Sequence, residues 1–279
     1  MKGLEKIWNT WGREALKFCA WGLAVGLVCF LLSRVVVNQN ARTTLVPLDG
    51  KWRDSLLAVS VPSGVKDTLV KYDAFEVHFN GGWGIANCTA YELTRGELHG
   101  ALKRGDDFME DPAVDGCPSP DAYAGSGLDR GHLVPAADLK WDDQALRQSF
   151  LMTNICPMHK ALNEGGWAKL EEKVREWTNR DSALLVFTGP VVAGGDSTLA
   201  AQPVKVPSHY FKVVLAPCVR PMRALAFIFP NGRCGGHLRQ YAVSVAEVER
   251  LTGLGFMTAL PEEQRQSIKQ GVNLDAWLN

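Results

Sequence analysis

The sequence predicts a mixed α+β domain in which strands and helices are interspersed along the chain. β-branched and aromatic residues dominate three segments bounded by Gly or Pro, namely 183–191, 209–216 and 223–229, which is typical of sheet strands. Apolar residues recur at intervals of three, four and three within 164–177, which predicts a long helix with one face in the core. With 279 residues and 46% hydrophobic content, the chain can bury one large core.

The N-terminal 37 residues differ in composition from the rest. Every residue from Phe18 to Leu32 is apolar or glycine, and basic residues precede this run, which favours insertion with the N-terminus in the cytoplasm. The run suits the core of a signal peptide and falls short of the about 20 residues of a spanning helix, yet no small-x-small cleavage site follows. Residues 1–37 are therefore expected to be a signal-anchor or signal peptide. The domain would be exported, either membrane-anchored through this segment or secreted or periplasmic if it is cleaved.

Export would permit disulfide bonds among the seven cysteines, whose odd number leaves one unpaired within the chain. Cys218 with Cys234 is the preferred pair, because these residues flank two expected neighbouring strands. Cys88 with Cys117 is the weaker alternative.

Residues 38–70 are polar and punctuated by Pro and Gly, so they are expected to be a linker to a domain at 71–279. Within the domain, 75–79 and 86–93 predict two strands joined by a glycine-rich turn. The segment 98–127 predicts a long irregular loop, and loops of that length inside a domain are more often functional than not.

Further elements follow from local signals. The apolar run 131–137 predicts a strand with His132 near its start, and 151–155 predicts a second, short extended segment. Between them, Asp142 or Asp143 could cap a short helix. Near the end of the chain, Ser244 with Glu247 forms a capping-box pattern, and Pro261 is expected to open a last helix.

His132 is the candidate general base, because the unperturbed pKa of imidazole lies nearest neutral pH. A single histidine on an apolar strand is more often a core residue. Arg130, two residues earlier, would share its face, whereas Asp129 would point to the other. A cation beside a base suits an anionic substrate.

Oxygen ligands occur on the predicted long helix. Asn163 lies near its start, and Glu171 and Arg175 lie about 40° apart around it. Amide and carboxylate oxygens suit Mg²⁺, which takes few protein ligands and keeps several waters. The alternative is that Glu171 and Arg175 form an ordinary surface ion pair one turn apart.

Charge is balanced over the chain, with 30 basic and 30 acidic residues, so a nucleic-acid partner would need a local positive surface. The segment 197–246 contains no Asp or Glu. Its basic residues would be either solvated strand edges or a positive wall along a phosphate backbone. They are Lys205, Lys212, Arg220, Arg223, Arg233 and Arg239.

Three motifs in order, at 129–132 (Asp-Arg-Gly-His), 153–157 (Thr-Asn-Ile-Cys-Pro) and 162–171 (Leu-Asn-Glu-Gly-Gly-Trp to Leu-Glu), resemble the signature of the DNA/RNA non-specific endonucleases. The resemblance covers roughly residues 75–271. It implies the ββα-metal (His-Me finger) nuclease fold, with a central antiparallel sheet flanked by helices. It also implies a metal-dependent endonuclease that acts on DNA and RNA independently of sequence.

Carried over residue by residue, the resemblance implies that His132 activates the attacking water. It makes Asn163 the direct ligand of a single Mg²⁺, and Glu171 a partner of metal-bound water. The arginines would contact the phosphate, and they are Arg104, Arg130 and Arg175. Asn154 would help to shape the metal site.

The sequence departs from the family pattern at three positions. Phe150 and Met158 stand where some relatives have polar side chains, and Cys156 replaces a small residue.

The sequence leaves the identity of the metal, the oligomeric state and the type of activity open. The metal could be Mn²⁺ or Ca²⁺, the chain could form a homodimer, and a non-catalytic nucleic-acid-binding module or a phosphodiesterase for small substrates would share these residues.

Overall fold

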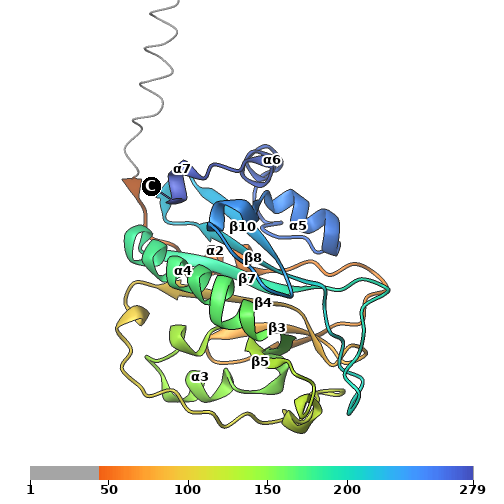
Figure 1. Ribbon diagram of the computed structural model, residues 1–279. Coiled ribbons are helices and arrows are strands. Elements are labelled where there is room, and N and C mark those ends of the chain that lie inside the picture. Colours follow the sequence, from red (N-terminus) through yellow and green to blue (C-terminus); the bar gives the residue numbers. More distant parts are fainter. Residues whose placement is uncertain (1–43, 279) are drawn as a thin grey trace, which may run out of the picture. The chain divides into compact units, whose positions relative to one another are not determined.

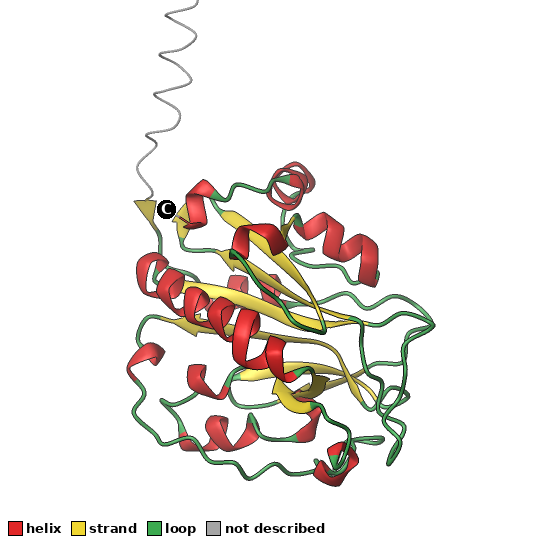
Figure 2. Ribbon diagram, in the orientation of Figure 1, coloured by secondary structure: helices red, strands yellow, loops and turns green. Residues whose placement is uncertain are grey.

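The computed structural model describes residues 44–278, which form one compact unit. Its centre is a seven-stranded antiparallel sheet in the order β11-β10-β8-β7-β4-β3-β2 (Figures 1 and 2). The strands of this sheet are β2 (Thr68–Lys71), β3 (Phe75–Asn80), β4 (Ile85–Thr94), β7 (Ala183–Val191), β8 (His209–Ala216), β10 (Arg223–Pro230) and β11 (Ala242–Val243). The predicted α+β class with a central antiparallel sheet is confirmed.

Helices lie on both faces of the central sheet (Figure 1), and two small two-stranded sheets accompany it. The helices are α2 (Gly50–Leu57), α3 (Asp143–Gln148), α4 (Ala168–Asp181), α5 (Val245–Thr252), α6 (Glu262–Gln270) and α7 (Asp275–Leu278). The short strands are β1 (Thr44–Leu45) with β9 (Val219–Arg220), and β5 (Asp129–His132) with β6 (Ile155–Met158). A π-helical segment, η5 (Leu162–Trp167), leads into α4, so β5, β6 and α4 form a ββα unit.

The four central strands β4, β7, β8 and β10 each contribute buried residues to two cores, because successive side chains point to opposite faces. In β7, Leu184 and Val186 join the core beneath α4, whereas Leu185 and Phe187 join the core beneath α5 and α6. Burial on both faces explains why β7 is apolar from Ala183 to Phe187. The ββα unit therefore lies on one defined face of the sheet.

The local signals placed several elements correctly. The 75–79 and 86–93 strands are β3 and β4, and all four apolar residues of the predicted helical stripe are buried in α4 or at its start. Ser244 Oγ accepts from the Glu247 amide at the start of α5, and α6 follows Pro261. Asp142, rather than Asp143, caps α3.

The expected linker 38–70 differs from the structure over the part that is described. Residues 44–70 contain β1, α2 and β2, and Leu56 of α2 is fully buried in the core beneath α5. Most residues of α2 are polar or partly exposed, and only Leu56 is buried. The composition of the segment therefore suggested a linker. The predicted signal-anchor or signal peptide, residues 1–37, lies outside the described residues.

Both expected disulfides are wrong, since all five described cysteines are free. Cys218 lies in the turn that joins β8 to β10, whereas Cys234 lies beyond the far end of β10. The strand between them is eight residues long, about 26 Å, and a disulfide needs Cα atoms within about 7 Å. Cys88 and Cys117 belong to cores on opposite faces of the sheet.

Two strand boundaries near the ββα unit also differ from the prediction. The strand expected at 131–137 is β5 and ends at His132, because the side chain of Asn154 takes over the hydrogen bonds of Val134. The expected extended segment 151–155 is a 3₁₀ turn, η4 (Met152–Asn154), followed by β6.

Candidate functional site

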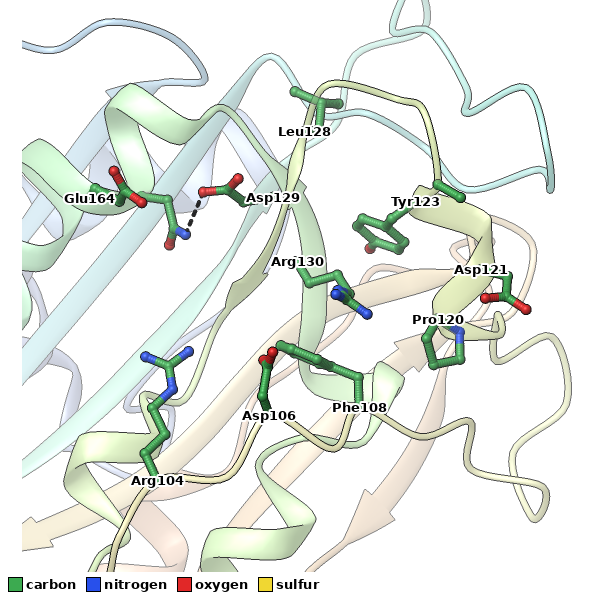
Figure 3. Close-up of a pocket in the computed structure, with 12 residues that line it drawn as sticks. Arg104, Asp106, Phe108, Pro120, Asp121, Tyr123, Leu128, Asp129, Arg130 and Glu164 are labelled. Atoms are coloured by element: carbon green, nitrogen blue, oxygen red, sulfur yellow. Dashed lines mark hydrogen bonds between the residues drawn. The ribbon is translucent and has the colours of Figure 1, made fainter.

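A cavity of about 640 Å³ opens beside the ββα unit (Figure 3). The long loop 98–127 forms one side of it, and β5 with η5 forms the other. Three of the predicted site residues line it, Arg104 from the loop, Arg130 from β5 and Asn163 from η5. The other four, His132, Asn154, Glu171 and Arg175, lie outside its lining.

Asn163 is held in one orientation by a neighbour from β5. Its Nδ2 donates to Asp129 Oδ2 over 2.9 Å, the dashed line in Figure 3. Because an ionised carboxylate can only accept, the amide nitrogen must face Asp129. Asn163 Oδ1 therefore lies on the other side of the amide, and it accepts no hydrogen bond from residues 44–278. The π-helical segment that carries Asn163 is a local irregularity of a kind frequent at functional sites.

His132 is packed between two aromatic rings. Its ring centroid is 4.9 Å from that of Phe150, edge to face, and 5.5 Å from that of Phe108. Only 8% of the residue is exposed, and the buried Nε2 has no hydrogen-bond partner in the described chain. Burial, aided by the charge of Arg104, lowers the pKa of His132 to about 3. A histidine kept only for packing would be expected to have its buried nitrogen bonded.

The side chains of Arg104 and Arg130 form no salt bridge or hydrogen bond with any residue in 44–278. The guanidinium carbon of Arg130 lies 4.4 Å from the centroid of the Phe108 ring, and that of Arg104 lies 5.8 Å from the centroid of Phe150. Arg130 and His132 both contact Phe108, as the alternation along β5 predicted. The cavity thus contains two cations that form no ion pair, although the acidic side chains of Asp106, Asp121, Asp129 and Glu164 also line it.

Asn154 is fully buried and does not reach the cavity. Its Oδ1 accepts from the Val134 amide, and its Nδ2 donates to the carbonyls of Val134 and Ser149. These bonds tie the segment after His132 to the segment that leads into β6. Asn154 therefore acts on the site through the backbone.

Arg175 is bonded to Asp138 and not to Glu171, so the alternative of a surface ion pair between Glu171 and Arg175 is wrong. Arg175 donates to Asp138 Oδ1 over 2.9 Å, and Tyr91 donates to Oδ2 over 2.8 Å. Burial raises the pKa of Asp138, an effect that Arg175 opposes. Burial likewise raises the pKa of Glu171, and the charge of Lys212 opposes it.

Lys212 is buried, although the sequence predicted a position at the surface. It was expected among solvated strand edges or in a positive wall, yet it has no exposed surface. Its Nζ donates to Thr188 Oγ1 over 2.7 Å and lies 4.8 Å from the centroid of the Trp167 ring. Period-two alternation along β8, which puts Tyr210 and Val214 in the core beneath α4, could have placed Lys212 there too.

Other residues of the acid-free segment are also engaged. Arg223 pairs with Asp181 on α4, and Arg239 pairs with Asp275 on α7. A continuous positive wall made of all six basic residues is therefore wrong. The sequence interpretation further missed Phe108 and Asp138, whose roles depend on contacts far along the chain.

The residues at the cavity fit a hard divalent cation. Within 44–278, no three His, Cys, Asp or Glu side chains are placed to hold a metal. The cavity instead offers the amide oxygen of Asn163 and the carboxylate of Asp129, in an open polar space. Mg²⁺ prefers oxygen ligands and retains several waters, so a site with few protein ligands suits it.

No helix between residues 44 and 278 has the length and hydrophobicity to cross a bilayer.

Comparison with known proteins places this arrangement in context. A family model described as DNA/RNA non-specific endonuclease matches residues 53–263, beginning inside the expected linker. "Nuclease EXOG, mitochondrial" of Danio rerio is 36% identical over 51% of this chain, and the match spans 46% of that protein. "Nuclease" of Nostoc sp. is 30% identical over 78% of this chain and 85% of that protein. The chain therefore spans under half the length of the zebrafish relative and most of the cyanobacterial one.

A solved structure confirms the fold. One chain of the crystal structure of the EndoG/EndoGI complex, which addresses the mechanism of EndoG inhibition, matches this fold with a TM-score of 0.66. The match covers 71% of this chain and 89% of that chain at 22% identity. The predicted fold, a central antiparallel sheet flanked by helices, is thereby confirmed.

Proposed function

Because the chain belongs to the DNA/RNA non-specific endonuclease family, we propose that it hydrolyses phosphodiester bonds inside DNA and RNA without sequence preference. His132 is the general base, and Asn163 holds a single divalent cation, Mg²⁺ or Mn²⁺. The observation that carries the proposal is the cavity itself, in which two arginines without partners face an asparagine whose amide is held by Asp129.

The arginines supply affinity for the substrate. Guanidinium groups present several N–H donors in a plane that matches two phosphate oxygens. Arg104 and Arg130 have these donors available, so both can bind the phosphate that is attacked. Arg175 lies outside the cavity lining, where it donates a hydrogen bond to Asp138. Its positive charge stabilises the ionised form of Glu171.

His132 is neutral at physiological pH, since its pKa is low. It can therefore accept a proton from water without first losing one. A bound phosphodiester would bring negative charge next to Arg104 and the imidazole, which would raise the pKa of His132 and strengthen it as a base. Substrate binding and proton transfer are coupled in this way.

When bound, the cation supplies Lewis-acid stabilisation of the leaving 3′-oxygen and of charge that develops on the phosphate. Asn163 would hold it through Oδ1, and Glu171 would orient its water shell. Asp129 keeps the amide of Asn163 in the orientation that this contact requires.

The test uses the full-length chain in detergent with circular plasmid and with RNA, in Mg²⁺ and in EDTA. Wild-type protein should linearise the plasmid and degrade the RNA only with the metal. His132→Ala should lose cleavage while it still folds and binds nucleic acid. Asn163→Ala should lose cleavage together with metal affinity, and Glu172→Gln, on the exposed side of α4 next to Glu171, is the control that stays active.

Four outcomes would contradict the proposal. Binding without any cleavage would favour a non-catalytic module, and hydrolysis of small phosphodiesters alone would favour the third alternative. Full activity of His132→Ala would remove the assignment of the base. An unchanged Mg²⁺ requirement in Asn163→Ala would remove Asn163 as the metal ligand.

We propose in addition that residues 1–37 direct the domain out of the cytoplasm and anchor it to the membrane. The support is the apolar run 18–32 with basic residues before it. Alkaline carbonate extraction of membranes that carry the full-length chain tests this proposal. Release of the intact chain into the supernatant would contradict anchoring.

A further inference from the structure

Five groups beside the cavity form a series of contacts, with an arginine at each end and three rings between them. Arg130 lies over Phe108, Phe108 contacts His132, His132 contacts Phe150, and Arg104 lies over Phe150. The two phenylalanines also contact each other edge to face, with centroids 5.2 Å apart. They come from separate segments, the long loop and the turn that follows α3, so only the fold brings them together.

This arrangement solves a problem that a phosphate-binding site faces. An arginine must be held in place before the substrate arrives, and a carboxylate is its usual partner. A carboxylate, however, would neutralise the charge and occupy the N–H donors that the phosphate needs. An aromatic face attracts the guanidinium group through its quadrupole and leaves the donors at the edge of the plane available.

We propose that Phe108 and Phe150 are positioning residues for the phosphate-binding arginines, holding Arg130 and Arg104 by their aromatic faces in place of carboxylates. This inference rests on the proposed function and goes further, because it assigns a role to two side chains that have no polar atom. Phe150 has a second effect, since it also contacts the ring of His132.

The two rings differ in what their loss should do. Phe108 is half-buried and contacts Arg130 at the shorter distance, so its loss should act mainly on substrate binding. Phe150 is 4% exposed and packs on His132 at 4.9 Å, so its loss should lower kcat as well as affinity. A purely structural role would give no such difference.

The experiment measures KM and kcat for cleavage by the full-length chain, and Kd for a fluorescent oligonucleotide in EDTA. Phe108→Leu removes the aromatic face and retains an apolar side chain. It should raise KM and Kd by about 3- to 30-fold, the range of a partly desolvated cation–π contact. Phe108→Tyr, which keeps the ring, should stay within about twofold of wild type in both constants.

A double-mutant cycle with Arg130→Ala decides whether Phe108 acts through Arg130. If it does, Phe108→Leu should change Kd by less than about twofold in the Arg130→Ala background. The equivalent cycle pairs Phe150→Leu with Arg104→Ala. Phe187→Leu, in the core on the opposite face of the sheet, is the control that loses stability and keeps Kd.

Additive effects in the Phe108 cycle would overturn the inference, as would a Tyr variant that binds as poorly as the Leu variant. These readouts are distinct from the test of the proposed function. Wild-type protein that binds the oligonucleotide and fails to cleave would overturn the endonuclease assignment, while the Kd cycle would still decide the role of the rings. Should Phe150→Leu not fold, the Phe108 cycle alone is sufficient.

Discussion

The amide of Asn163 is bonded through Nδ2 to the carboxylate of Asp129, 34 residues earlier in the chain. The bond joins the π-helical segment to β5, the two elements that form one side of the cavity. It gives the asparagine a fixed orientation before any cation arrives. The relationship makes Asp129, rather than Asn163 alone, responsible for the geometry of the proposed metal site.

Asp129→Ala should weaken metal binding, because the amide of Asn163 would be free to rotate. Loss of such a partner behind a metal ligand typically costs about 10- to 100-fold in metal affinity or activity. The measurement is the Mg²⁺ concentration at half-maximal cleavage. Asp115→Ala is the control, since Asp115 is almost fully exposed and lies 3.9 Å from Lys66 in a surface ion pair. An unchanged half-maximal Mg²⁺ concentration in Asp129→Ala would show that the bond does not orient Asn163.

His132 should make the stability of the protein depend on pH. Burial, with help from Arg104, lowers its pKa from 6.5 to about 3, so the unfolded chain binds a proton at this residue before the folded protein does. The stability that His132 contributes is therefore complete above pH 6.5 and is lost as pH falls towards 3, at about 1.4 kcal/mol per pH unit.

Urea unfolding of wild type and His132→Gln at pH 7 and pH 5 measures this effect. The difference in unfolding free energy between the two proteins should fall by about 2 kcal/mol between these pH values. Glu171, whose raised pKa acts in the opposite direction, is present in both proteins and cancels in the difference. A difference that is the same at both pH values would contradict the expectation.

Gly131→Ala should disturb the site, because an added Cβ would lie 2.6 Å from Met158 Cβ on the facing strand β6. Such overpacking typically costs about 1–3 kcal/mol of stability. It would also displace Arg130 and His132, and misplacement by about 1 Å can reduce activity by about 100-fold. Urea unfolding and plasmid cleavage measure the two effects. Gly194→Ala, where an added Cβ meets nothing within 4 Å, is the matched control, and equal behaviour of the two variants would refute the prediction.

Lys212→Met should destabilise the protein although no solvent-exposed surface changes. It removes the donor to Thr188 and the positive charge near Glu171 and Asp138. Hydrogen bonds from charged groups contribute about 1.5–3 kcal/mol, which sets the expected loss in urea unfolding. Adding Glu171→Gln should recover part of this loss. A Lys212→Met variant as stable as Lys51→Met, a change at an exposed position, would show that the buried charge contributes nothing.

Local patterns in the sequence were sufficient for most of the secondary structure and for the family to which the chain belongs. The β3–β4 hairpin, the cap at Ser244 and the buried stripe of α4 follow from signals within a few residues, because backbone geometry and side-chain periodicity are short-range properties. The motifs that contain His132, Asn163 and Glu171 indicated the family, which the comparison confirmed.

Tertiary structure decided what each of these residues contacts. Arg175 met Asp138 rather than Glu171, Lys212 was buried rather than solvated, and α2 proved to be part of the domain. These contacts join segments that are far apart in the sequence and are brought together by the sheet. The spacing of residues along the chain therefore does not predict them. The contacts of Phe108 and Phe150 were likewise decided by the tertiary structure. No local pattern in the sequence marks these two residues, and they contact His132 and the arginines only in the folded protein.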